Sequence, residues 1–207
     1  MDPRTDRLLM AGQAAGPIFV ATVAVQAVTR TGFDLSHHPL SLLTLGDRGW
    51  IQIANFVVAG LLSVAFAVGV GRRLTGGPGS VWAARLFAVF GLGLILGGAF
   101  VPDPALGYPS GTPDEIPASL SVHGVVHAVA PPLAFLALVA ASFVVARRCA
   151  ARGRTWAAIL TRAVGVVCLV LSLPVGPGLS IRLFAAVTIG FTWICWFGGY
   201  LRRADEA

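Results

Sequence analysis

The sequence predicts an all-α integral membrane protein, a bundle of six transmembrane helices, on three observations. Hydrophobic residues make up 56 % of the 207 residues and charged residues only 12 %, about half the charged fraction of a typical soluble domain. Six apolar stretches, each close to the ~20 residues that cross a bilayer, follow one another along the chain. Arginines gather in alternate connections between these stretches. A chain with so little polar surface is expected to face lipid on its outside.

The six predicted spans fill most of the chain and are separated by short turn-forming segments. The spans cover residues 8–29, 50–71, 82–101, 120–146, 156–174 and 179–201. Glycine and proline mark the joints, most clearly at 75–80 and 174–178. Arg4 and Arg7 precede the first stretch as in a signal peptide, but about 22 apolar residues exceed a signal h-region, so we assign a span. We therefore expect one transmembrane domain over 1–207.

Arginine sets the predicted orientation of the bundle. All 15 basic residues are arginine, and 12 of them fall on the side that holds both termini. The other side holds only Arg30, Arg48 and Arg182. The positive-inside rule therefore predicts cytoplasmic N- and C-termini, and we expect a multi-pass protein of the inner (plasma) membrane. Basic charge placed in this way reports topology, so no nucleic-acid partner is expected.

All four histidines lie on the predicted outer side. His37 and His38 belong to the first outer connection, whereas His123 and His127 begin the fourth span at i, i+4 spacing and share one helix face. About 19 residues, or roughly 28 Å of helix, separate His127 from the arginines at the other end. His127 is therefore expected near the outer hydrocarbon boundary. Pro131 cannot donate to the carbonyl of His127, which predicts a kink and a cavity wall beside this pair.

Further polar residues are predicted on the same side. Gln52 and Asn55 lie three residues apart on one face of the second span, and the second outer connection carries Asp103 and Tyr108 but no arginine. The apolar segment 39–46 is too short to cross the membrane. It is expected to lie in the interface or to re-enter the bundle, because irregular backbone is tolerated at depth only when protein covers it. Either position brings the first histidine pair to the outer mouth of the bundle.

Four motifs on this side resemble a known family. They are Asp34-Leu-Ser-His-His-Pro-Leu-Ser-Leu-Leu, Gly46-Asp-Arg-Gly-Trp50, Asn55 with Gly60-Leu-Leu62, and His123-Gly-Val-Val-His127. Over nearly its whole length the chain is similar to the bacterial integral membrane family known only as domain of unknown function 998. The resemblance implies a multi-span membrane protein and carries no established activity.

The first functional hypothesis is a metal-dependent membrane hydrolase. Two histidines at i, i+4 spacing and a third histidine hold zinc in many enzymes and leave a position open for water. Here His123, His127 and His38, or His37 in its place, would supply the nitrogens. The candidate catalytic residues are the four histidines and two carboxylates that act as base or orient a ligand: Asp34, His37, His38, Asp103, His123 and His127.

The second hypothesis is metal-free acid–base chemistry on a lipid or isoprenoid, such as isoprenoid cyclisation. A carboxyl group in an apolar mouth has a raised pKa and donates a proton to substrate. Asp34, Asp47 and Asp103 are the candidates. Four other residues are expected to contact substrate: Trp50, Gln52, Asn55 and Tyr108. Under both hypotheses the partner is a membrane lipid or a lipophilic small molecule.

A non-catalytic scaffold or accessory subunit explains the same residues without chemistry. Histidine, aspartate, tryptophan and proline at a membrane boundary cap helices and anchor the interface. A transporter is disfavoured, because the middle of the predicted spans carries almost no ionisable residue to mark a pathway. The sequence does not decide whether the protein is an enzyme.

Overall fold

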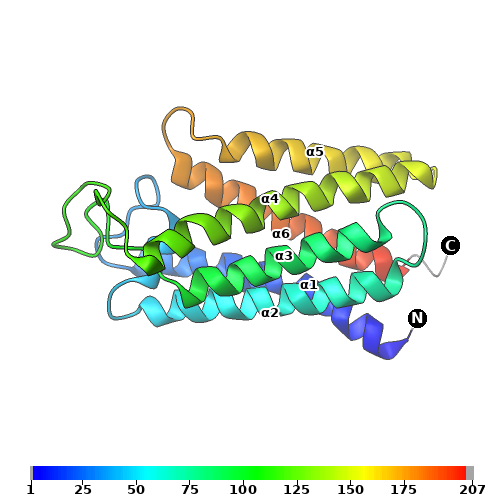
Figure 1. The fold of residues 1–207 in the computed structure, drawn as a ribbon, viewed down its shortest axis with the longest axis horizontal. Coiled ribbons are helices and arrows are strands. Elements are labelled where there is room, and N and C mark those ends of the chain that lie inside the picture. Colours follow the sequence, from blue (N-terminus) through cyan, green and yellow to red (C-terminus); the bar gives the residue numbers. More distant parts are fainter. Residues whose placement is uncertain (1, 204–207) are drawn as a thin grey trace.

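The computed structural model describes residues 2–203, and this part of the chain is all-helical, with no β-strand. Six helices are long and apolar enough to cross a membrane, which confirms the predicted fold class. They are α1 (Pro3–Thr29), α2 (Gly49–Arg73), α3 (Ser80–Ala99), α4 (Val122–Ala151), α5 (Thr155–Ser172) and α6 (Leu179–Arg203). A short 3-10 helix, η1 (Leu40–Thr44), lies between α1 and α2. Each predicted span overlaps one helix (Figure 1).

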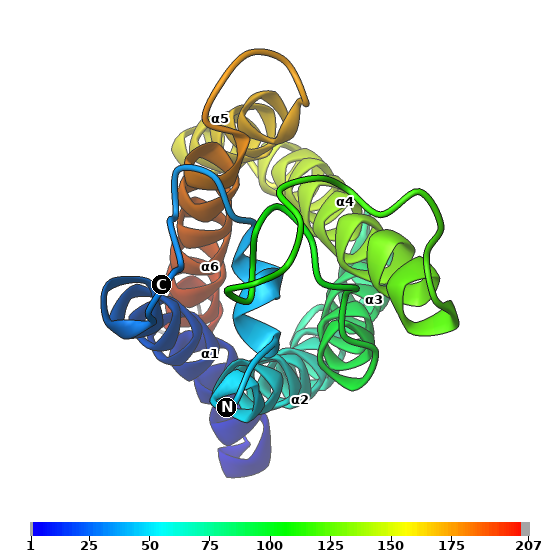
Figure 2. The same cartoon turned by 90° about the vertical axis from the view of Figure 1, so that its left-hand side faces the viewer.

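The six helices form a closed ring in chain order. Each helix packs against the next one in the sequence, and α6 packs against α1 to complete the circle, whereas helices on opposite sides of the ring barely touch (Figure 2). At one end of the bundle, η1 lies inside the ring (Figure 2).

The two ends of the ring differ in composition, and we name them accordingly. The histidine end consists of the connections 30–48, 100–121 and 173–178. The arginine end consists of the connections 74–79 and 152–154 together with the N-terminal end of α1 and the C-terminal end of α6. The orientation of these two ends relative to the cytoplasm stays a prediction.

Helix starts follow from local sequence. At the beginning of α1 the Asp2 carboxylate accepts a hydrogen bond from the Thr5 N–H at 3.1 Å, and Pro3 occupies the first helical position, where its missing N–H costs nothing. At the beginning of α4 the Ser121 hydroxyl accepts from the Gly124 N–H at 3.0 Å. Arginines in the last turn of α2 and of α6 suit the negative end of each helix dipole.

The half of the ring next to the arginine end is densely packed with aromatic side chains. Phe66 and Phe87 meet edge to face with ring centroids 4.9 Å apart. Trp193 stacks on Phe87 at 5.6 Å and on Phe197 at 5.7 Å. All four side chains are at most 3 % exposed. This stack joins α2, α3 and α6 across the inside of the ring.

Polar contacts at the arginine end close the ring. Arg202 near the end of α6 forms a salt bridge with Asp6 of α1 at 2.6 Å and donates to the Gln13 side chain at 2.9 Å. Arg148 of α4 donates to the carbonyl of Gly76 at 2.8 Å and so folds the connection 74–79 against the bundle.

Candidate functional site

The first connection at the histidine end folds back into the ring. Leu42 and Leu43 of η1 are 3 % and 0 % exposed, and η1 lies at the centre of the ring when the bundle is viewed from this end (Figure 2). Gly49 permits this approach, since a Cβ atom there would lie 2.0 Å from the carbonyl oxygen of Thr44. Of the two positions predicted for segment 39–46, re-entry is the one the structure adopts.

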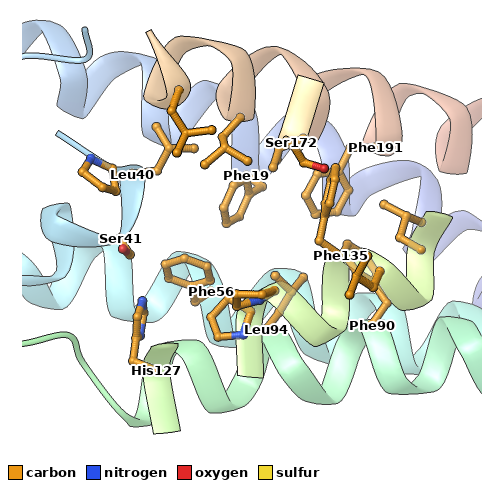
Figure 3. Close-up of a pocket in the computed structure, with 18 of the residues that line it drawn as sticks. Phe19, Leu40, Ser41, Phe56, Phe90, Leu94, His127, Phe135, Ser172 and Phe191 are labelled. Carbon is orange, nitrogen blue, oxygen red and sulfur yellow. The ribbon is translucent and has the colours of Figure 1, made fainter. Parts of the chain in front are cut away.

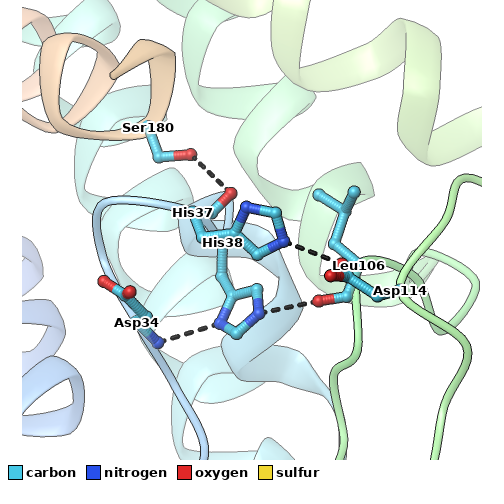
Figure 4. Close-up of polar contacts among 6 residues, drawn as sticks. All are labelled: Asp34, His37, His38, Leu106, Asp114 and Ser180. Atoms are coloured by element: carbon cyan, nitrogen blue, oxygen red, sulfur yellow. Dashed lines mark hydrogen bonds and ion pairs between the residues drawn. The ribbon is translucent and has the colours of Figure 1, made fainter. Parts of the chain in front are cut away.

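His38 forms hydrogen bonds that join the connection 30–48 to the connection 100–121. The side chain is 5 % exposed, and both ring nitrogens are engaged (Figure 4). Nδ1 accepts from the Asp34 N–H at 2.9 Å, and Nε2 lies 2.8 Å from the carbonyl oxygen of Leu106. Because a carbonyl only accepts, the hydrogen is on Nε2 and the ring is the neutral Nε2–H tautomer.

Three more contacts tie the connections at the histidine end to one another. His37 Nε2 lies 2.9 Å from the Asp114 carboxylate, and the Ser180 hydroxyl donates to the His37 carbonyl at 3.3 Å (Figure 4). The Arg30 Nε donates to the buried Tyr108 hydroxyl at 3.2 Å. The first histidine pair thus contacts the second connection through Leu106 and Asp114.

His127 is held in one orientation by the end of α3. It is 7 % exposed, and its Nδ1 donates to the carbonyl of Phe100 at 2.7 Å. This bond fixes the hydrogen on Nδ1 and leaves Nε2 as a bare acceptor, for which residues 2–203 provide no hydrogen-bond donor. His123 is exposed and packs its ring on the Phe100 ring at 5.2 Å.

A cavity of about 590 Å³ lies inside the ring, in the half next to the histidine end. Helices α4, α5 and α6 form most of its wall, and η1 closes the end where His127 lies (Figure 3). Five phenylalanines contribute much of the surface: Phe19, Phe56, Phe90, Phe135 and Phe191. Pro131 and Pro132 also line it, within a helix that continues past both. The sequence predicts a cavity wall beside His123 and His127; the cavity is lined by His127 and not by His123.

The polar side chains that line the cavity are few. They are Ser41, His127 and Ser172. The Ser172 hydroxyl donates a hydrogen bond to the carbonyl of Leu169 in the same helix at 2.8 Å. The Ser41 hydroxyl, by contrast, has no hydrogen-bond partner in the described part of the chain, and it lies at the same end of the cavity as His127 (Figure 3). One free hydroxyl and one free imidazole nitrogen therefore sit together at an otherwise apolar cavity.

The cavity opens on the side of the bundle. Ala128, Pro132 and Leu136 form one stripe of α4 that lines the cavity and is also exposed on the outside of the bundle. Leu169 and Leu173 do the same at the end of α5. The opening therefore lies between α4 and the hairpin of α5 and α6.

A family model described as a protein of unknown function, DUF998, matches residues 13–199. The match covers nearly all of the ring and both halves of its interior. The chain belongs to the DUF998 family. No curated protein and no solved structure matches it.

The three-histidine metal site predicted for this DUF998 protein is not formed. Across residues 2–203 no group of three or more histidine, cysteine, aspartate or glutamate side chains lies close enough to hold a metal ion. His38 has both nitrogens engaged, so it has no lone pair to give a metal. His123 and His127 are joined to Phe100 in different ways, by ring packing and by a hydrogen bond, and do not converge on one point.

The predicted proton-donating carboxyl groups in the DUF998 protein are also corrected. Asp34 is exposed, and hydrogen bonds from the Ser36 hydroxyl and N–H hold its pKa below the usual value of 3.8. The pKa of Asp103 is lowered mainly by hydrogen bonds from Ser121 and further by the charge of His123. Both carboxylates stabilise loops and a helix start, and a carboxyl with a lowered pKa is a poor proton donor. The third candidate, Asp47, is exposed and lies outside the cavity.

The four residues predicted to contact substrate all lie outside this cavity. Trp50 is 66 % exposed at the start of α2, as is usual for a membrane-interface anchor. Gln52 and Asn55 are buried between α1 and α2, where the Gln52 Oε1 accepts from Gln26 at 2.7 Å and from Asn55 at 3.2 Å. Tyr108 belongs to the second connection and is 3 % exposed.

Several cavity residues were not predicted from the sequence. Ser41 and the five phenylalanines carry no motif that separates them from ordinary core residues. The signal that points toward them is indirect: the apolar segment 39–46 is too short to cross and must be covered by protein, and Pro131 and Pro132 mark an irregular helix face. Together these features indicate a hollow at the histidine end but not the residues on its far wall.

Proposed function

We propose that this DUF998 protein binds a lipophilic molecule, a membrane lipid or isoprenoid, in the cavity near the histidine end. The observation that carries the proposal is an apolar cavity of about 590 Å³ that is open on the side of the bundle and bounded at one end by the free Nε2 of His127. Small-molecule sites have this size, this apolar lining and these few polar groups. We place the protein in the plasma membrane.

Filling the cavity with a hydrocarbon chain is favourable for a physical reason. Side chains around an empty space lose dispersion contacts on one side. Water is a poor filler, since it needs two to four polar partners and this lining offers very few. A chain from the surrounding bilayer restores the contacts without leaving an apolar medium. The phenylalanines suit an unsaturated or branched chain as well as a straight one.

The polar end of the cavity favours a ligand with a hydroxyl-like head group. The bare Nε2 of His127 accepts a hydrogen bond, and the Ser41 hydroxyl both donates and accepts. A head group that gives one hydrogen to His127 and takes one from Ser41 would satisfy both. Such bonds contribute on the order of 1 kcal/mol each and fix the direction in which the ligand lies.

The test is a cavity-filling substitution with a matched control on the same helix. Ala128→Phe adds a phenyl ring to the cavity lining, whereas Val129→Phe adds one to the exposed, non-lining face one residue further along α4. Each variant is purified in detergent, and the retained lipids are extracted and quantified by mass spectrometry. We expect a specific lipid or isoprenoid to copurify with wild type and Val129→Phe and to be lost from Ala128→Phe. Equal retention by all three proteins would contradict the proposal and favour the scaffold.

A second candidate function is acid–base catalysis on the bound molecule. The observation that favours it is the tautomer of His127, since a base needs its lone pair directed at the substrate while its other nitrogen is held. Nε2 would take a proton from the ligand head group or from Ser41, and the bond to Phe100 would stabilise the imidazolium. His127→Asn places an N–H near the position of Nδ1 for the Phe100 carbonyl but supplies no base. Proteoliposomes of wild type, but not of this variant, are then expected to convert a lipid of the host extract into a new species.

A further inference from the structure

A second cavity at the histidine end has a larger share of polar side chains in its lining than the first. It encloses about 330 Å³ between the end of α1 and the start of α2, and it shares no lining residue with the first cavity. Polar side chains supply five of its lining residues: Thr22, Gln26, Thr29, Arg30 and Arg48. Two of the three arginines predicted for this side of the membrane therefore meet in one cavity.

Arg30 is a charged group without a charged partner. Its guanidinium donates to the Tyr108 hydroxyl and to the carbonyls of Leu43 and Leu45, all of which are neutral acceptors. Its Nη1 is buried and has no hydrogen-bond partner within the described residues. Gln26, which lines the same cavity, leaves its Oε1 buried without a partner.

Arg48 adds a second positive charge to the same cavity. It is exposed, and neither arginine forms a salt bridge with any carboxylate of residues 2–203. Arg30 is partly buried, and a partly buried charge is stabilised by a counterion. The carboxylates of residues 2–203 do not supply one.

We infer that this cavity binds the phosphate group of an anionic phospholipid in the leaflet at the histidine end. A guanidinium pairs with phosphate through parallel N–H donors, and the Nη1 of Arg30 is buried without a partner in residues 2–203, so the Arg30 side chain would turn toward the cavity to present it. Ala21, Val25 and Ile51 complete the lining with apolar surface, and the first two are exposed on the face of α1. A lipid chain can lie along that face while its phosphate contacts both arginines.

The inference does not depend on the proposed function, because the two cavities are separate. A phosphate at Arg30 would bind the same guanidinium that holds Tyr108 and the segment after η1. Occupation of the site is therefore expected to stabilise the whole histidine end, and a rise in melting temperature reports it.

The experiment titrates the full chain in a neutral detergent with three probes and follows the melting temperature. The probes are phosphatidylglycerol, diacylglycerol with the same chains, and inorganic phosphate. Arg48→Gln is the test variant, because the Arg48 side chain makes no hydrogen bond within residues 2–203, and the substitution keeps its backbone bond to Ile51. Arg182→Gln is the matched control, since Arg182 lies at the same end but donates to the carbonyl of Leu173 at 3.1 Å.

We expect phosphatidylglycerol to raise the melting temperature of wild type and of Arg182→Gln equally. Its apparent affinity should fall about fivefold in Arg48→Gln, as for one arginine near a lipid surface. An unchanged affinity in Arg48→Gln, or equal weakening in both variants, would overturn the inference. An equal response to diacylglycerol would assign the binding to chains alone, and an equal response to inorganic phosphate would assign it to a free anion. Either result rejects a phospholipid site.

Discussion

The two halves of the ring are built from the same six helices yet are packed in opposite ways. Toward the arginine end, Phe66, Phe87, Trp193 and Phe197 fill the interior with stacked rings. Toward the histidine end, Phe191 contacts Phe19 and Phe90, and the lining phenylalanines still leave a space of about 590 Å³ between them and the other wall residues. In a membrane, tight packing replaces the hydrophobic effect as the source of cohesion between helices. The packed half therefore stabilises the fold, and the hollow half is free to bind a ligand.

The polar residues follow the same division. At the arginine end, Arg202 and Arg148 join helix ends and connections, and their partners belong to the same chain. At the histidine end, His127 lines one cavity and Arg30 with Arg48 line the other, and none of these side chains has a charged partner in residues 2–203 that would neutralise it. Gln52, Asn55 and Arg182 also carry buried polar atoms without a partner among the described residues, outside both cavities.

The largest effect is expected from truncating an aromatic ring in the packed half. Phe87→Ala removes a side chain that is 0 % exposed, and the loss is expected to be about 3–5 kcal/mol of unfolding free energy. Phe135→Ala removes a half-buried ring from the cavity wall and should cost on the order of 1 kcal/mol, because half of its contacts are already missing. Denaturant unfolding in detergent measures both. Similar losses would mean that lipid or a rearranged wall fills the cavity as densely as the aromatic stack.

A smaller loss of stability is expected for substitutions of the two histidines of α4, and it should differ between them. His127→Ala leaves the carbonyl of Phe100 without a donor and is expected to destabilise by about 1–3 kcal/mol. His123→Ala removes only an exposed ring contact and should stay within about 0.5 kcal/mol. Thermal melts of the two single variants compare them directly. If His123→Ala proves as costly, the pair acts as one unit, and the assignment of His127 alone to the cavity is mistaken.

The smallest effect is expected on the melting temperature when the pH is lowered and Asp103, next to the start of α4, becomes protonated. Hydrogen bonds from Ser121 lower the pKa of Asp103 below its usual 3.8. A group whose pKa is lower in the folded state stabilises the protein above its unfolded pKa, and this stabilisation disappears as the pH falls through the folded value. The melting temperature of wild type should therefore exceed that of Asp103→Asn at pH 5, and the gap should close below about pH 4. Asp47→Asn, an exposed aspartate at the same end, serves as the control. A gap that does not change with pH would contradict this role.

The sequence predicts the fold better than the site, for a physical reason. Span number and position depend on local hydropathy, which each stretch carries by itself. The cavity depends on which side chains fail to meet across the ring, and that is a property of pairs such as Phe56 and Phe135 on different helices. The histidines were noticed because they are polar at a membrane boundary. Their roles depend on partners such as the carbonyls of Leu106 and Phe100, and backbone groups carry no signal in a sequence.

The same distinction explains the two corrected expectations. A metal site and a proton-donating carboxyl group were predicted from residue types alone, without the local bonds that occupy them. His38 uses both nitrogens, and Asp34 is bonded by Ser36 only two positions away. Re-entry of segment 39–46, by contrast, was one of two predicted positions, because backbone hydrogen-bonding requirements restrict where such a segment can lie.

Because α1 packs against α6, every helix has two neighbours in the ring, and the same ring could be formed by a chain that begins with a different helix. Each helix keeps both neighbours if the ends of α1 and α6 are joined by a linker and a new break is introduced in the connection 74–79, because both lie at the arginine end. The rearranged chain would begin with α3 and end with α2, and since its number of helices is still even, every helix would cross in its original direction. Circular permutation is usually tolerated where termini adjoin and the cut falls in an exposed connection. The fold is thus a cyclic arrangement that happens to be encoded by a linear chain.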